Sequence, residues 1–60
     1  MTTIKMNDGR TQYDVKEDYY KVRDDLQMLT QSFIELTDTQ LGKVLLNVNN
    51  ILSVRVTNNV

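Results

Sequence analysis

The side chains that could perform acid–base chemistry in this chain are carboxylates, lysines and tyrosines, because the sequence contains no histidine and no cysteine. Their absence excludes a Ser-His-Asp or Cys-His nucleophile set and a zinc site of the ordinary Cys/His type. Five of the eight acidic residues lie in one short segment, and they are Asp14, Glu17, Asp18, Asp24 and Asp25. Whether these carboxylates do chemistry depends on how the elements place them.

The spacing of these carboxylates favours a structural role. Asp14 and Glu17 are spaced as an Asp-x-x-Glu capping box, and Asp18 adds negative charge where a helix dipole stabilises it. Asp24 and Asp25 are adjacent, so on a helix they diverge by about 100° and cannot share a proton or a metal ion. The sequence therefore predicts a protein that is not an enzyme and uses no cofactor and no metal.

A helix is predicted over residues 15–29 from one apolar stripe, made of Val15, Tyr19, Val22, Leu26 and Leu29. Glu17 and Lys21 form a favourable i,i+4 pair on it. Tyr20 and Met28 point away from the stripe. Either they are isolated exposed side chains, which are common, or they contribute to a surface that binds a partner.

The segment before the helix predicts a β-hairpin. Asp8-Gly9 is a favoured two-residue turn of type I′, which requires a positive φ at both central residues. Folding the chain there places Met6 opposite Thr11, Ile4 opposite Tyr13 and Thr2 opposite Val15. One face then carries Ile4, Met6, Tyr13 and Val15, which is the pattern of a half-buried hairpin.

The C-terminal half predicts further strands. Residues 33–37 form one strand, residues 38–43 a turn or loop, and residues 44–48 and 51–56 two more segments of β pattern. The order is β-β-α-β-β with room for a fifth strand. The expected fold is a single α+β domain, residues 1–60, with a small, mostly antiparallel sheet and one amphipathic helix packed on it.

Two observations predict a homo-oligomer, most simply a dimer. A chain of 60 residues buries a small core, and without cysteine or a zinc site the remaining source of stability is another subunit. Leu45 and Leu52 lie off the inward face of their strands, so a second copy or a partner would cover them. The alternative is that strand twist places both at a protected rim.

Charge and hydropathy limit the cellular locations and the classes of partner that are expected. The net charge is −1, so nucleic acid is an unlikely partner for the whole chain. After Asp38 the charges are only Lys43 and Arg55, which either bind a small anion in a groove between subunits or are solvated strand charges. No apolar run approaches the roughly 20 residues of a membrane span, and residues 1–5 lack a signal-peptide core. A cytoplasmic protein that does not enter the membrane is expected.

A stretch from Gly42 through Asn47, Asn49-Asn50 and Ile51 to Val54 resembles the Gly, strand, Asn, then Ile and Val pattern of small flagellar FlbD-like proteins. It is also similar to the terminal strands of LytTR DNA-binding domains. The second resemblance implies DNA binding, for which this chain lacks the basic residues. In type, the chain looks like the small accessory proteins of bacteriophages and prophages, which implies action by binding.

These observations favour a non-enzymatic small protein that acts by protein–protein interaction, such as an inhibitor or regulator of a host protein. The residues expected at the partner surface are Tyr20, Met28, Leu45 and Leu52. One alternative is an oligomer that sequesters a nucleotide-type anion through Lys43 and Arg55. A nucleic-acid-binding regulator is the other.

Overall fold

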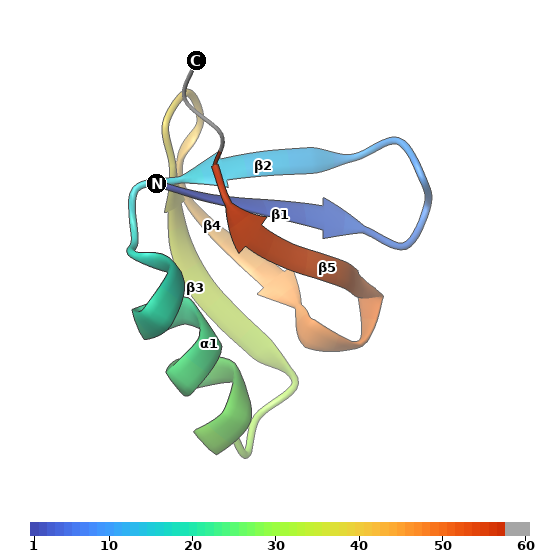
Figure 1. Cartoon of the computed structure of the whole chain (residues 1–60). Helices are drawn as coiled ribbons and strands as arrows, with labels where there is room; N and C mark the ends of the chain where they lie inside the picture. Colours follow the sequence, from blue (N-terminus) through green and yellow to red (C-terminus); the bar gives the residue numbers. More distant parts are fainter. Residues whose placement is uncertain (58–60) are drawn as a thin grey trace.

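The computed structural model describes residues 1–57 and contains one antiparallel sheet with one helix packed on it (Figure 1). The elements follow the order β1 (Thr2–Met6), β2 (Gln12–Val15), α1 (Tyr19–Met28), β3 (Phe33–Asp38), β4 (Gly42–Asn47), the 3-10 turn η1 (Val48–Asn50) and β5 (Ile51–Val56). The strands lie side by side in the order β4-β3-β2-β1-β5. The predicted fold class is confirmed, and the fifth strand is present.

The β1–β2 hairpin has the predicted register but a different turn. Thr2 lies opposite Val15 and Ile4 opposite Tyr13, as expected. Of the two central residues of this turn only Gly9 has a positive φ, of 78°, so Asp8-Gly9 is not a type I′ turn. The loop is longer than predicted: the Gly9 N–H donates to the carbonyl of Met6, and the Asp8 carboxylate accepts from the backbone N–H groups of Arg10 and Thr11, each at 2.8 Å.

The helix starts later than the sequence pattern predicts. Asp18 is its N-cap and accepts a hydrogen bond from the Tyr20 N–H at 3.1 Å. Val15 ends β2 and does not belong to the helix. The predicted capping box is wrong, because its two carboxylates bind elsewhere: Asp14 accepts from the Thr3 hydroxyl, and Glu17 accepts from Thr37.

One ion pair on the helix surface also differs from the prediction. Lys21 contacts Asp25 at 2.9 Å and forms no ion pair with Glu17 in the described structure. The stripe itself is confirmed from Val22 onward: Val22 is fully buried, and Leu26 and Leu29 pack against the core from a half-buried position. Tyr19 is half-buried but is not part of this core cluster.

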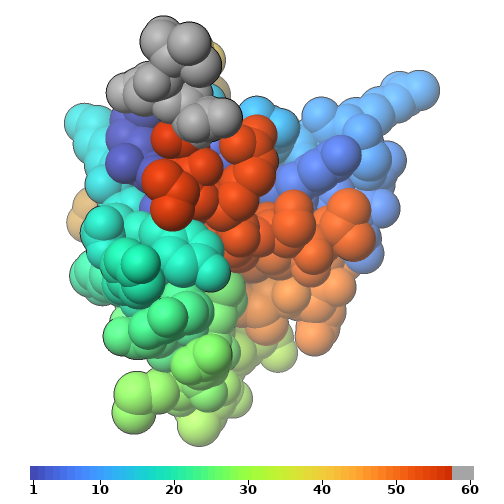
Figure 2. Space-filling model, viewed as in Figure 1, coloured from blue at the N-terminus to red at the C-terminus, as the bar shows by residue number. Residues whose placement is uncertain are grey.

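The core lies between α1 and the concave face of the sheet. Its buried members come from α1 and from β1 to β4, and they are Ile4, Val15, Val22, Ile34, Leu36 and Leu46. Ile51 and Val54 of β5 pack against this cluster from partly buried positions. The sheet bends between β2 and β3, where the only paired residues are Val15 and Asp38. Figure 1 shows β3 and β4 running at a steep angle to β1 and β2, and Figure 2 shows α1 beside β5 on the viewed face. This bend leaves most of one edge of β3 without a neighbouring strand.

Candidate partner-binding groove

A groove at the C-terminal end of α1 gathers exposed apolar side chains from three elements. Its lining, which we call the helix-end groove, comprises Asp25, Met28, Leu29, Gln31, Phe33, Ile34, Glu35 and Leu45. Met28 is 82% exposed, Leu45 63% and Phe33 47%. Large apolar side chains that share one depression are typical of protein-binding surfaces.

Each of these side chains is positioned by a regular feature of its element. Met28 is the last residue of α1 and lies off the buried stripe, while the following Leu29 takes an extended backbone that ends the helix. Glu35 lies directly opposite Leu45 in the β3–β4 pair, and Phe33 lies on the same face of β3 as Glu35. Phe33 and Leu45 are therefore diagonal neighbours on the outer face of the hairpin.

The backbone of β3 adds unpaired polar groups to this groove. The Thr37 N–H donates to the Glu17 carboxylate and the Thr37 carbonyl accepts from the Lys16 N–H, so both groups of Thr37 point away from β4. Hydrogen-bonding directions alternate along an antiparallel strand, so the backbone groups of Glu35 and Phe33 point the same way. Among the described residues, β2 pairs with β3 only at Val15, which leaves this part of the β3 edge open.

Glu17 ends the pairing at this edge. Its carboxylate accepts hydrogen bonds from the backbone N–H and the hydroxyl of Thr37, both at 2.9 Å. Partial burial by itself raises the pKa of Glu17, but the hydrogen bonds from Thr37 and the nearby Lys21 ammonium outweigh it and lower the pKa below its ordinary value. The carboxylate thus acts as a cap for a strand edge and stays ionised at neutral pH.

The charges beside the groove are paired within the chain. The Lys21 ammonium donates to the Asp25 carboxylate at 2.9 Å, a contact that raises the pKa of Lys21. Glu35 and Lys43 approach to 3.7 Å across the β3–β4 hairpin. Both pairs are exposed and contribute little to stability, so a partner could rearrange them at small cost.

The predicted partner surface is only partly assembled. Met28 and Leu45 meet at the helix-end groove, but Tyr20 and Leu52 are not among its lining residues. Tyr20 instead packs on α1, with its ring 5.3 Å from that of Tyr19 and the Arg23 guanidinium 5.0 Å from its centroid. Leu52 is exposed on β5, at the opposite end of the sheet from β4.

Phe33 is a candidate functional residue that the sequence patterns did not identify. It begins β3, and its parity with Glu35 and Thr37 places it on the outer face. The alternation of side chains along the predicted strand was enough to place Phe33 on the outer face. The proximity of Phe33 to Met28 could not be predicted in this way. Recognising an aromatic residue on the polar face of a strand would have nominated it.

The two cations of the predicted anion site lie on different strands. Lys43 lies on β4 and Arg55 on β5, which are the two outermost strands of the sheet. Lys43 also has Glu35 as its ion-pair partner. A site between subunits that uses both cations stays a prediction.

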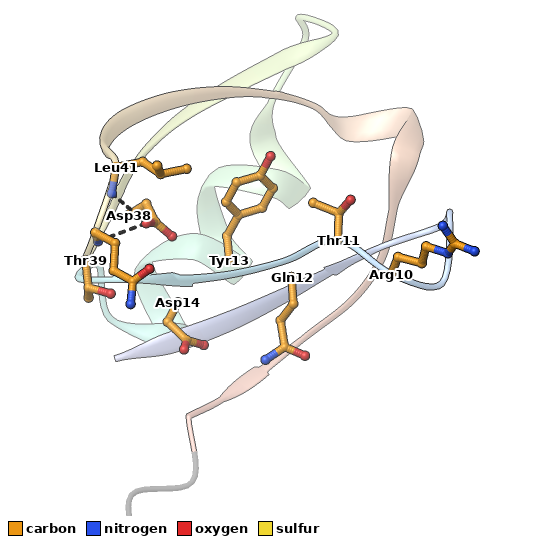
Figure 3. A pocket seen from close by; sticks show the side chains of 9 residues that line it. Arg10, Thr11, Gln12, Tyr13, Asp14, Asp38, Thr39 and Leu41 are labelled. Carbon is orange, nitrogen blue, oxygen red and sulfur yellow. Dashed lines mark hydrogen bonds between the residues drawn. The ribbon is translucent and has the colours of Figure 1, made fainter.

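A second depression lies where β2 diverges from the β3–β4 turn (Figure 3). Tyr13 and Leu41 point to one side of the β2 ribbon there, whereas Gln12 and Asp14 point to the other. Its one buried carboxylate, that of Asp38, accepts hydrogen bonds from the backbone N–H groups of Gln40 at 2.9 Å and Leu41 at 2.8 Å. These hydrogen bonds lower the pKa of Asp38, which suits a turn cap and not a general base.

Within residues 1–57, no group of three or more carboxylates, histidines or cysteines is arranged to hold a metal ion. The one helix described is too short and too polar to cross a membrane. Comparisons with family models, with curated proteins and with solved structures found no match to this chain.

Proposed function

We propose that this protein is a non-enzymatic binding module that captures an extended segment of another protein in the helix-end groove. The observation that carries the proposal is the coincidence of two features in one place. Exposed apolar side chains of Met28, Phe33 and Leu45 surround a strand edge whose backbone groups at Phe33 and Glu35 have no partner strand.

Strand addition uses both features together. An extended segment laid along the β3 edge would exchange backbone hydrogen bonds with Glu35 and Phe33, and its alternate side chains would enter the apolar groove. Backbone pairing supplies affinity with little dependence on sequence, while the groove selects an apolar side chain. Occlusion of such a segment would inhibit or regulate the protein that carries it.

The roles of the carboxylates support binding over catalysis. Glu17, Asp18 and Asp38 each accept backbone N–H groups, and Asp25 forms an ion pair with Lys21. A carboxylate engaged in this way stabilises the fold and is poorly placed to exchange protons with a substrate.

The test is capture of a polypeptide from a host-cell lysate by immobilised protein, repeated with matched variants. We expect Met28→Ser and Leu45→Ser each to lose most of the captured polypeptide, because each removes apolar contact area from the groove. Leu41→Ser is the control, since Leu41 is more exposed than Leu45 but lies in the β3–β4 turn. Equal capture by all of these variants would exclude the groove as the binding surface.

We also propose that the protein is a homodimer. The small core and the exposed apolar residues on β5 support self-association, which would use a surface separate from the groove.

A further inference from the structure

We propose that β5 is the dimer interface and pairs antiparallel with β5 of a second copy, centred on Val54. Within residues 1–57, β5 pairs only with β1, so no other strand of the chain occupies its second edge. Leu52 and Val56 on this strand are each 60% exposed. An open, apolar, proline-free edge strand is a template for pairing with another chain.

The hydrogen-bonding alternation shows which residues of β5 face the open edge. The Met6 N–H donates to the Thr11 carbonyl, so Met6 and Ile4 direct their backbone groups to β2. Thr3 and Lys5 therefore direct theirs to β5, where their partners are Arg55 and Ser53. The backbone groups of Val54 and Val56 then point outward and are available to a second copy.

One two-fold register satisfies both the backbone and the side chains. With Val54 opposite Val54 of the second copy, Leu52 of each chain lies opposite Val56 of the other. The two most exposed apolar side chains of the strand thereby cover one another. On the other face, Ser53 lies opposite Arg55 of the second copy, so no like charges meet.

Other registers lose this match. If the two-fold axis passed through Arg55, the two Arg55 guanidinium groups would lie opposite one another. The backbone groups of Arg55 would also be unavailable, because they already bind β1. A register shifted by one residue places the apolar face of one strand against the polar face of the other. A β-bulge frees Leu52 for this contact, because Lys5 pairs with Ser53 and Met6 with Ile51, which leaves Leu52 without a partner in β1.

Self-pairing of β5 is also the arrangement that stops at two copies. Pairing of β5 with the open edge of β4 would be head-to-tail and would generate a ring or a filament. The β5 pair is isologous and closed, and it extends the sheet across the two-fold axis. None of the residues that line the helix-end groove belongs to β5, and the inference rests on the proposed homodimer and not on the groove binding a partner.

The first measurement is sedimentation equilibrium of the full chain over a wide range of protein concentrations. We expect a reversible dimer of 7.0-kDa chains. The double variant Leu52→Lys with Val56→Lys should raise the dimer Kd on the order of tenfold or more, because it removes the apolar contacts between the strands. The control variant Leu41→Lys, at an exposed position in the β3–β4 turn and outside β5, should leave the Kd unchanged.

The register is tested by cysteine cross-linking, which is clean because the chain has no cysteine of its own. A mixture of Ser53→Cys and Arg55→Cys chains should form the mixed disulfide far more than either self-disulfide, since only unlike positions lie opposite one another. Both positions are exposed, so these variants should keep the fold.

Three results would overturn the inference. The first is a monomer at every concentration reached. The second is an assembly larger than a dimer, which would favour β4–β5 pairing. The third is a dimer that resists the lysine substitutions and shows no preference for the mixed disulfide, which would place the interface elsewhere.

Discussion

Glu17 and Thr37 meet across the open edge of β3, where one carboxylate accepts both the backbone N–H and the hydroxyl of the threonine at 2.9 Å. The two residues are far apart in the sequence, and their contact joins the segment before α1 to the strand that borders the helix-end groove. It also satisfies the last outward N–H of β3 before the pairing with β2 begins.

Removal of this carboxylate should destabilise the fold. We expect Glu17→Ala to lower the free energy of unfolding by about 1–3 kcal/mol, because the partly buried Thr37 N–H loses its acceptor. Urea denaturation followed by circular dichroism measures the change. Asp24→Ala is the matched control, since Asp24 contacts only Arg23 at the surface and should change stability by no more than about 0.5 kcal/mol. An equal effect of the two substitutions would show that the Glu17–Thr37 contact is energetically neutral.

The same contact should make stability depend on pH. The folded-state pKa of Glu17 lies below its ordinary value of 4.5, so its contribution is complete above that value and is lost as the pH falls through the folded-state pKa. Glu17→Gln cannot titrate, and its curve of unfolding free energy against pH should be flatter on the acid side. Parallel curves for the two proteins would contradict this assignment. The pKa of Asp8 is lowered further, to about 2, mainly by the Thr11 hydroxyl, so it titrates only at more acidic pH.

The helix cap offers a second stability test. Asp18→Ala should cost about 0.5–2 kcal/mol, because the Tyr20 N–H at the first turn of α1 loses its acceptor. Asp18→Asn should recover most of this loss, since asparagine caps helices nearly as well as aspartate. Thermal unfolding of the three proteins provides the measurement, and no rescue by asparagine would point to a role of the charge itself.

Core packing should respond strongly to truncation at the centre of β3. Leu36 is almost completely buried, so Leu36→Ala should cost about 2–5 kcal/mol, enough to unfold much of a domain this small. Leu41→Ala removes the same atoms from an exposed position and should be close to neutral. Denaturant midpoints distinguish the two cases, and similar midpoints would mean that the β3 core is loosely packed.

The open edge of β3 predicts a specific pattern of amide hydrogen exchange. Glu35 directs its N–H away from β4, whereas the neighbouring Leu36 pairs with Val44 and directs its N–H toward β4. The Glu35 amide should therefore exchange much faster than that of Leu36, and it should become protected when a partner adds a strand. Slow exchange of Glu35 in the isolated protein would mean that the edge is already covered.

Local patterns in the sequence predicted most of the fold. The register of the β1–β2 hairpin followed from the pairing around Gly9, and the exposure of Met28 and Leu45 followed from helix and strand periodicity. The start of α1 could not be predicted in the same way. Asp14 and Glu17 form a capping box by spacing, but Thr3 and Thr37 bind their carboxylates, and that competition arises only in the folded chain.

The candidate groove needed information that no local pattern contains. Met28, Phe33 and Leu45 become neighbours because the chain reverses after α1 and β4 folds back along β3. The open edge beside them exists because β2 leaves the sheet after Val15 to enter the helix. Strand order also places Lys43 and Arg55 on the two outermost strands, whereas the sequence grouped these residues by charge alone.

The pairing of β1 with β5 has a consequence for how the protein is made. β1 lies between β2 and β5, so Ile4 has Tyr13 on one side and Val54 on the other. During synthesis the second neighbour emerges from the ribosome long after the first, and until then one edge of β1 lacks its strand. We expect the β1–β2 and β3–β4 hairpins to form early and the closing contact with β5 to set the rate of folding, because distant segments must find each other in that step. Before it pairs with β1, the apolar β5 strand is exposed on both edges and can contact β5 of another chain. Slow pairing of β5 therefore increases both the risk of aggregation and the chance of dimer assembly.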